Sequence, residues 1–231
     1  MTDLSQFPIT QRWPANDPSV IQLYAYPTPN GVKVSIALEE MGLAYEPHLV
    51  TLADKDVRSP EFLSLNPNNK IPAIIDPNGP NGPLTLFESG AILIYLAEKS
   101  GKFIGNDAAE KAKVIQWLMF QMGGLGPMFG QMGYFIKFAG KEIEDPRPRQ
   151  RYIDEAKRLL NVLNKELDGK DWIAGSYSIA DMAIGPWLVA LEFYGAKALV
   201  GYDEFKNVAA YVERFLARPA VQKGRTIPAT S

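Results

Sequence analysis

The chain contains 231 residues, of which 46% are hydrophobic and 22% charged, so it can bury a sizeable core and is not expected to be generally disordered. Its net charge of −2 offers no excess of Lys or Arg for a nucleic-acid surface. It has no cysteine, which excludes disulfides and a cysteine nucleophile. It has a single histidine, His48, which argues against a histidine-built metal site and against a Ser-His-Asp triad.

The N-terminus carries neither a positively charged leader nor an apolar run before a cleavage site. No segment reaches the roughly 18 consecutive apolar residues of a membrane helix. The absence of cysteine fits a reducing compartment. We therefore expect a cytoplasmic protein without a membrane segment.

Residues 1–19 are predicted to form an extended N-terminal arm, because three prolines interrupt any periodic pattern. The arm contains Phe7, Ile9 and Trp13, apolar side chains that favour docking on the body of the protein or on a partner subunit. The alternative is a floppy tail.

The next residues, 20–104, show the pattern of a compact α/β domain. Strand-like runs cover residues 20–26, 45–52, 71–75 and 84–87. Helical spacing over residues 32–41 ends at Gly42, and a second helix follows residue 88. A short turn is expected at 60–65, and the stretch 77–83, rich in Gly, Pro and Asn, predicts a hairpin loop. The order β-α-β followed by β-β-α predicts a mixed sheet.

The composition shifts near residues 101–107, and residues 105–231 show helical patterns without a strand run between them. We therefore expect a domain boundary there and an all-helical second domain. Helical patterns cover residues 107–138, 146–167, 178–194 and 203–217. The first of these contains Gly123, Gly124, Gly126 and Pro127, although glycine costs about 1 kcal/mol relative to alanine in a helix and proline kinks it. We expect a break between two helices there, together with close approach of the backbone to a ligand or a partner subunit.

Glu88 and Ser89 lie where a predicted strand ends and a helix begins. Ser89 is a favourable N-cap, and that structural role is sufficient to explain it. The first turn of a helix also has free N–H groups and a partial positive charge. Ser89 and these groups can hold a carboxylate while Glu88 holds an ammonium, so the pair indicates a site for an amino-acid ligand.

Pro72 opens a predicted strand, a position that suits an edge or a special turn because proline has no N–H. A cis Ile71–Pro72 bond would turn the chain sharply and leave the backbone groups of Ile71 available. An extended peptide ligand can then pair with them as an added strand. The alternative is a trans turn before an edge strand.

Together these stretches resemble the glutathione transferase family over roughly residues 20–220. The N-terminal likeness lies in PTPNG (27–31), NPNNKIPAI (66–74) and LFESGAILIYLAEK (86–99). In the helical half, Ser178 to Asp181 (SIAD) resembles the N-capping box of the family. The stretch QMGGLGPM (121–128) is most similar to the bacterial nu class and to fungal relatives akin to a nitrogen-regulating prion protein.

The resemblance implies a thioredoxin-like N-terminal domain, an all-α C-terminal domain and glutathione as cofactor. It also implies that Lys70, Ile71 and Pro72 hold the glycyl end and backbone of glutathione, and that Glu88 and Ser89 hold the γ-glutamyl end. Lys55 is a further candidate for the glycyl carboxylate, although a solvated lysine is the simpler interpretation.

The reactive form of glutathione is the thiolate, and a chain without cysteine has to take its sulfur from the cofactor. Donors near that sulfur are expected in the turn after the first strand, where Thr28 would donate its hydroxyl and Asn30 would be a second donor. The alternative is that both residues only shape the turn. Tyr24 and Tyr26 are rival donors, since some classes of the family use tyrosine.

Nu-like members hold two glutathione molecules, or the oxidised disulfide, per site, and Arg151 matches the arginine that grips the additional carboxylates. The resemblance thus implies a homodimeric glutathione-dependent disulfide-bond oxidoreductase with transferase activity, acting on small thiols and disulfides or electrophiles. Two alternatives stay open: a non-catalytic glutathione-binding regulator, and a transferase specialised for an electrophile, such as a dehalogenase or ether-cleaving enzyme.

Overall fold

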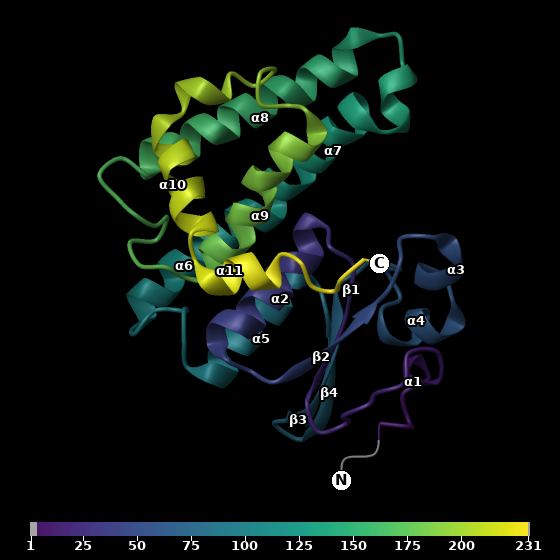
Figure 1. The fold of residues 1–231 in the computed structure, drawn as a ribbon. Helices are drawn as coiled ribbons and strands as arrows, with labels where there is room; N and C mark the ends of the chain where they lie inside the picture. Colours follow the sequence, from purple (N-terminus) through teal and green to yellow (C-terminus); the bar gives the residue numbers. More distant parts are fainter. Residues whose placement is uncertain (1–3, 231) are drawn as a thin grey trace. The chain divides into compact units, whose positions relative to one another are not determined.

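A computed structural model describes residues 4–230 of the chain, and it contains one four-stranded sheet (Figure 1). The strands are β1 (Ile21–Ala25), β2 (Tyr45–Leu49), β3 (Ala73–Gly79) and β4 (Gly82–Phe87), in the spatial order β2-β1-β3-β4. Strand β1 is parallel to β2 and antiparallel to β3, and β3 is antiparallel to β4. The predicted mixed sheet is confirmed.

The chain forms two compact units, which divide after Gly101. The first unit contains the sheet and also the C-terminal segment from Pro219, and the second begins at Lys102 and ends at Arg218. The sequence prediction assigned all of residues 105–231 to the helical domain, so it did not include the C-terminal segment in the first unit.

Helices α2 (Pro29–Met41) and α5 (Ser89–Ser100) pack against each other in the first unit. Helix α11 (Pro219–Gly224), which the sequence did not predict, packs on α2. There the Ser35 hydroxyl donates to the Gly224 carbonyl at 2.7 Å, and the Lys223 ammonium lies 2.9 Å from the Glu39 carboxylate. The C-terminal segment therefore stabilises the helix that carries Asn30.

The hairpin between β3 and β4 is longer than predicted. Strand β3 continues to Gly79 and β4 begins at Gly82, so Pro80 and Asn81 alone separate the two strands. A register shift between Asp76 and Gly79 accommodates the irregular pairing. Pro and Gly in this stretch favoured a loop, but backbone pairing continues through it.

The N-terminal arm is docked on the first unit and is not simply extended. It contains a helical turn, α1 (Ile9–Arg12), in which Ile9 is fully buried. Leu4 and Ile9 join a core cluster between the sheet and the short helices α3 (Asp54–Val57) and α4 (Pro60–Leu65). The core residues of this cluster are Leu4, Ile9, Tyr24, Val50, Val57, Phe62, Leu65, Ala73 and Ile75.

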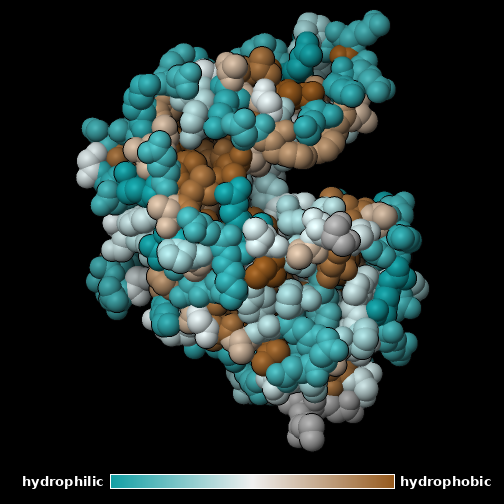
Figure 2. All heavy atoms as spheres, viewed as in Figure 1, coloured by the Kyte–Doolittle hydropathy of each residue, from teal (hydrophilic) through white to brown (hydrophobic). Residues whose placement is uncertain are grey.

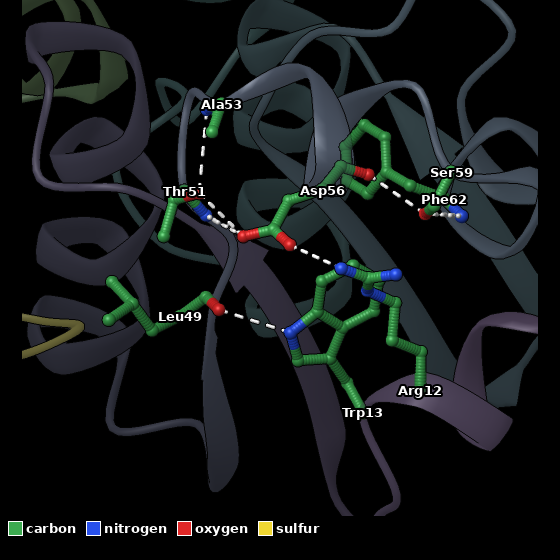
Figure 3. A network of polar contacts seen from close by, with 8 residues as sticks. All are labelled: Arg12, Trp13, Leu49, Thr51, Ala53, Asp56, Ser59 and Phe62. Carbon is green, nitrogen blue, oxygen red and sulfur yellow. Dashed lines mark hydrogen bonds and ion pairs between the residues drawn. The ribbon is translucent and has the colours of Figure 1, made fainter.

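Polar contacts fix the end of the arm to the last residue of β2 and to α3, as Figure 3 shows. The Trp13 indole donates to the Leu49 carbonyl at 3.1 Å, and the Arg12 guanidinium lies 2.5 Å from the Asp56 carboxylate. Burial raises the pKa of Asp56, but hydrogen bonds from Thr51 and the ion pair with Arg12 outweigh it, and the net pKa lies below its usual value.

Replacing Trp13 with alanine should lower the free energy of unfolding by about 2 kcal/mol, because the half-buried ring packs edge-on against Tyr24 and Phe62. Urea denaturation measures the change. The exposed arm variant Gln11→Ala should be neutral. Equal stability of Trp13→Ala and the parent chain would show that the arm does not stabilise the domain.

The second unit is helical, as predicted. Its helices are α6 (Ala108–Phe120), η1 (Gln121–Leu125), α7 (Gly126–Lys137), η2 (Ala139–Glu142), α8 (Pro146–Glu166), α9 (Ile179–Tyr194), η3 (Tyr202–Glu204) and α10 (Lys206–Leu216). The combination of an α/β thioredoxin-like domain with an all-α domain is confirmed.

Between α6 and α7 the helix continues through η1, a π-helical turn, so the predicted break is wrong. A side chain at Gly126 would have its Cβ 2.4 Å from the buried amide of Gln121 and 3.2 Å from the Trp187 ring. A larger residue at 126 would therefore displace the Gln121 amide and the Trp187 ring, whereas Gly123 has open space around it.

Ser178 caps α9 in a complete capping box with Asp181, as predicted. The Asp181 carboxylate is fully buried and accepts from the Ser178 N–H at 2.9 Å, the Ile173 N–H at 3.1 Å and the Tyr211 hydroxyl at 3.0 Å. One carboxylate thus joins the start of α9 to α10 and to the preceding loop.

On the face shown in Figure 2, hydrophilic residues cover most of the surface, and hydrophobic residues gather in one broad patch and several smaller ones. Within residues 4–230 no helix is long and apolar enough to cross a membrane. The same residues contain no group of three or more His, Cys, Asp or Glu side chains placed to hold a metal ion.

Candidate functional site

Three segments meet at one end of the sheet. Ala73, the first residue of β3, pairs with Tyr24 near the end of β1 and with Phe87 at the end of β4. Since β3 runs antiparallel to both neighbours, the turn after β1, the residues before β3 and the residues after β4 lie together. These segments carry most of the candidate residues that the sequence placed in the first domain, namely Thr28, Asn30, Lys70, Ile71, Pro72, Glu88 and Ser89, whereas Lys55 lies on α3.

Thr28 is the N-cap of α2, and its hydroxyl oxygen accepts from the Gly31 N–H at 3.2 Å. A hydroxyl that accepts one hydrogen bond still has its own proton to donate. The half-buried Thr28 therefore shapes the turn and also retains a donor, so the structural and functional interpretations of this residue are compatible.

Gly31 is required by the same turn. A Cβ at this position would lie 1.9 Å from the Tyr26 carbonyl oxygen, a backbone atom that cannot rotate away. Replacing Gly31 with alanine should displace the start of α2, lower the free energy of unfolding by about 2 kcal/mol and weaken glutathione binding. Thermal melting and titration calorimetry measure the two effects. A variant with unchanged melting would contradict the tight packing of this turn.

Asn30 lies two residues into α2, and its amide oxygen accepts from the Lys33 ammonium at 2.8 Å. The same ammonium lies 3.2 Å from the Ser89 hydroxyl. Helices α2 and α5 are thus linked at their first turns, and the two candidate residues Asn30 and Ser89 share one buried cation.

Glu88 and Ser89 stand at the start of α5, but the predicted N-cap assignment is wrong. Glu88 occupies the N-cap position and Ser89 is the first helical residue, with no side-chain cap at this end. Glu88 has φ 70° and ψ 110°, a backbone conformation that a non-glycine residue rarely adopts. The Glu88 carboxylate is exposed and the adjacent Ser89 hydroxyl is buried. The pair thus presents an acceptor for an ammonium group next to a donor for a carboxylate.

The Ile71–Pro72 bond is cis, which decides between the cis and trans alternatives that the sequence left open. Strand β3, which follows it, lies between β1 and β4 and is not an edge strand. The proline is compatible with an interior strand because Pro72 precedes the first paired residue, Ala73. The loop before it is held by Asn66, whose buried amide donates to the Lys70 carbonyl at 2.5 Å. Ile71, which forms the cis bond with Pro72, is half-buried, and the preceding Lys70 is exposed.

Tyr24, a rival sulfur donor, is fully buried in the core cluster on the arm side of the sheet. Burial raises its pKa, and its hydroxyl has no hydrogen-bond partner among residues 4–230. Tyr26 is half-buried and Lys55 is exposed on α3. The geometry therefore favours Thr28 over Tyr24.

Arg151 lies in the second unit, on α8, and its side chain is exposed. Its positive charge helps to lower the pKa of Glu155, although the hydrogen bond from Arg158 is the larger cause. A role for Arg151 toward a second glutathione stays a prediction.

Lys33 is the residue that the sequence interpretation missed. It is the single charged residue in the stretch 31–38, which is otherwise apolar or small, and it is fully buried. The signal that could have identified it is a lone lysine in an apolar helix, one turn after a candidate donor.

Two family profiles match the chain. The profile described as the N-terminal domain of glutathione S-transferase matches residues 19–98, and the one described as the C-terminal domain matches residues 130–219. Among curated proteins, the disulfide-bond oxidoreductase YfcG of Escherichia coli is 47% identical, over 87% of this chain and 92% of its own length. The URE2 protein of Eremothecium gossypii is 32% identical, over 84% of this chain and 64% of its own length.

Solved structures are similar along nearly the whole chain. A glutathione transferase from Pseudomonas putida, with one glutathione disulfide bound per subunit, is 62% identical with a TM-score of 0.97, covering 98% of this chain and 100% of that one. A glutathione transferase from Burkholderia graminis, with two glutathione molecules per subunit, is 62% identical with a TM-score of 0.98, covering 100% of this chain and 98% of that one.

Proposed function

Because this chain belongs to the glutathione S-transferase family, we propose that it is a glutathione-dependent disulfide-bond oxidoreductase that also has glutathione transferase activity. One observation carries the proposal. Thr28, Asn30, Glu88 and Ser89 lie at one end of the sheet, in a chain that has no cysteine. Hydroxyl and amide donors at that place serve a thiol sulfur, which the protein itself does not contain because it has no cysteine.

Three segments bind different parts of glutathione: the first turn of α5, the residues before β3 and the first turn of α2. Ser89 and the N–H groups at the start of α5 receive the α-carboxylate of the γ-glutamyl residue, and Glu88 receives its ammonium. The backbone of Ile71, next to the cis bond, pairs with the cysteinyl residue, and Lys70 attracts the glycyl carboxylate. The thiol then lies at the start of α2, near Thr28 and Asn30.

At the start of α2, the Thr28 hydroxyl and the Asn30 amide donate hydrogen bonds to the sulfur, and the helix terminus adds partial positive charge. These groups stabilise the thiolate relative to the thiol. When bound, two glutathiones supply the chemistry: two thiols reduce one substrate disulfide to two thiols, with transfer of two protons, and leave as glutathione disulfide.

Arg151 is proposed to hold a carboxylate of the second glutathione, since a guanidinium grips a carboxylate through two hydrogen bonds. The similar structures from Pseudomonas putida and Burkholderia graminis, which hold a disulfide or two glutathiones per subunit, support a site of this size. A homodimeric state and a cytoplasmic location belong to the same proposal.

The test is titration calorimetry with reduced and oxidised glutathione, followed by two assays on the same preparation. We expect binding of both forms and glutathione-dependent reduction of a small mixed disulfide, with slower conjugation of an aryl halide. Binding without either activity would favour a non-catalytic regulator. Faster conjugation than reduction would favour a transferase specialised for an electrophile. No uptake of either form at millimolar concentration would overturn the proposal.

A further inference from the structure

Lys33 is the least expected residue of the site, because its side chain is fully buried in α2 and lysine is rarely buried without a function or a partner. Its ammonium contacts the amide oxygen of Asn30 at 2.8 Å and the hydroxyl of Ser89 at 3.2 Å. These residues belong to the two helices that begin at the glutathione-facing end of the sheet.

The contact with Asn30 decides which end of its amide faces the ligand. An ammonium has three donors and no acceptor, so it holds the Oδ1 end of the amide. The Nδ2 end, which is the donor, then points away from Lys33. A rotation of the amide by half a turn would place two donors against each other and is strongly disfavoured.

The contact with Ser89 acts in the same way. Because the hydroxyl oxygen accepts from Lys33, the hydroxyl proton is directed to another acceptor. Burial lowers the pKa of Lys33 to about 7, and the nearby Glu88 charge opposes this effect. An arriving carboxylate or thiolate favours the charged ammonium, since opposite charges attract strongly away from water.

We propose that Lys33 is a positioning residue that orients the Asn30 donor toward the thiolate and the Ser89 donor toward the γ-glutamyl carboxylate of glutathione. This inference rests on the proposed function. Lys33 touches neither reacting atom in this account and acts through its two neighbours. One buried cation thereby links recognition of the ligand's carboxylate to stabilisation of its sulfur.

The test measures the pKa of the thiol of bound glutathione in the parent chain and in Lys33→Met. The titration is monitored through the ultraviolet absorbance of the thiolate. Methionine keeps the length and apolar stem of the side chain but removes the donors. We expect the thiol pKa to rise by about one unit in the variant, with about tenfold slower disulfide reduction at neutral pH. In Lys33→Gln, which keeps an uncharged donor, the shift should be intermediate.

Lys99→Met is the matched control, because Lys99 belongs to the same unit and pairs with the buried Asp76 carboxylate at 2.9 Å. It should lower stability without changing the thiol pKa. A double-mutant cycle adds a second readout: Asn30→Ala should have at most about a threefold effect when Lys33 is already methionine, since Lys33 acts through Asn30.

An unchanged thiol pKa in Lys33→Met, with normal glutathione binding, would overturn the inference and leave the proposed function intact. Absence of binding to the parent chain would overturn both. If neither lysine variant folds, the parent chain still provides a test by nuclear magnetic resonance. Magnetisation transfer is expected between the Asn30 amide protons and the cysteinyl methylene of bound glutathione, and its absence would overturn the inference.

Discussion

Replacing Thr28 with valine should slow glutathione-dependent disulfide reduction about 100-fold, the usual effect of removing one donor from a developing anion in a catalytic site. Valine has the shape of threonine but cannot donate to the sulfur. The thiol pKa of bound glutathione should rise in parallel, because the thiolate loses a hydrogen bond that the thiol does not need. Steady-state kinetics and the thiolate absorbance measure the two effects.

The variant also removes the N-cap acceptor for Gly31, which should cost about 1 kcal/mol of stability. Thr28→Ser keeps both the donor and the cap and should retain most of the activity. Thr85→Val, which removes an exposed hydroxyl from β4, should behave like the parent chain. Equal activity of Thr28→Val and Thr28→Ser would remove this hydroxyl from the proposed chemistry.

Replacing Asp181 with asparagine should lower the free energy of unfolding of the helical unit by about 3 kcal/mol. Both carboxylate oxygens accept hydrogen bonds from buried donors, and an amide replaces one of those oxygens with a group that only donates. The start of α9 would lose its capping box and its link to Tyr211 at the same time. Chemical denaturation followed by circular dichroism measures the loss.

Asp107→Asn provides the matched control for this prediction. Asp107 caps α6 in the same unit by accepting from the Ala109 and Glu110 N–H groups, but it is exposed, and asparagine is an equally good N-cap. Its stability should change by less than about 0.5 kcal/mol. A similarly small loss for Asp181→Asn would show that the buried network contributes little.

The effect of Asp181→Asn should also depend on pH. Burial raises the pKa of Asp181 to about 6, above the value of about 4 in an unfolded chain. A group with a raised pKa in the folded state contributes stability that is fully present below its unfolded pKa and is lost as the pH rises through its folded pKa. The stability difference between the parent chain and the variant should therefore narrow between about pH 4 and pH 7, and a constant difference would contradict the raised pKa.

Features of the fold and of the site that depend on local geometry were visible in the sequence. Ser178 and Asp181 form the predicted capping box, since such a box needs residues only three positions apart. The special turn at Pro72 was visible for a similar reason, because proline at the start of a strand has no N–H, but the structure alone decided that the bond is cis. The four strands and the longer helices likewise followed from periodicity, although the short helices α1 and α11 and the ends of β3 and β4 did not.

Other features depend on residues that are distant in the sequence. Lys33 contacts Ser89 across 56 positions, and only the packing of α2 on α5 brings the two together. Leu4 and Ile9 of the arm are buried against residues that follow much later, so no local pattern could show that the arm docks. The N-cap at Glu88 was missed because the positive φ of that residue is set by its surroundings.

The amino-acid sequence by itself determined the two kinds of domain, the mixed sheet and the absence of a sulfur nucleophile, because periodicity and composition are local properties of the chain. The tertiary structure alone decided that a buried lysine holds the amide of Asn30 and the hydroxyl of Ser89 in one place. The physical reason is that an ammonium withdrawn from water needs acceptors from more than one helix, and packing alone determines which acceptors lie within its reach.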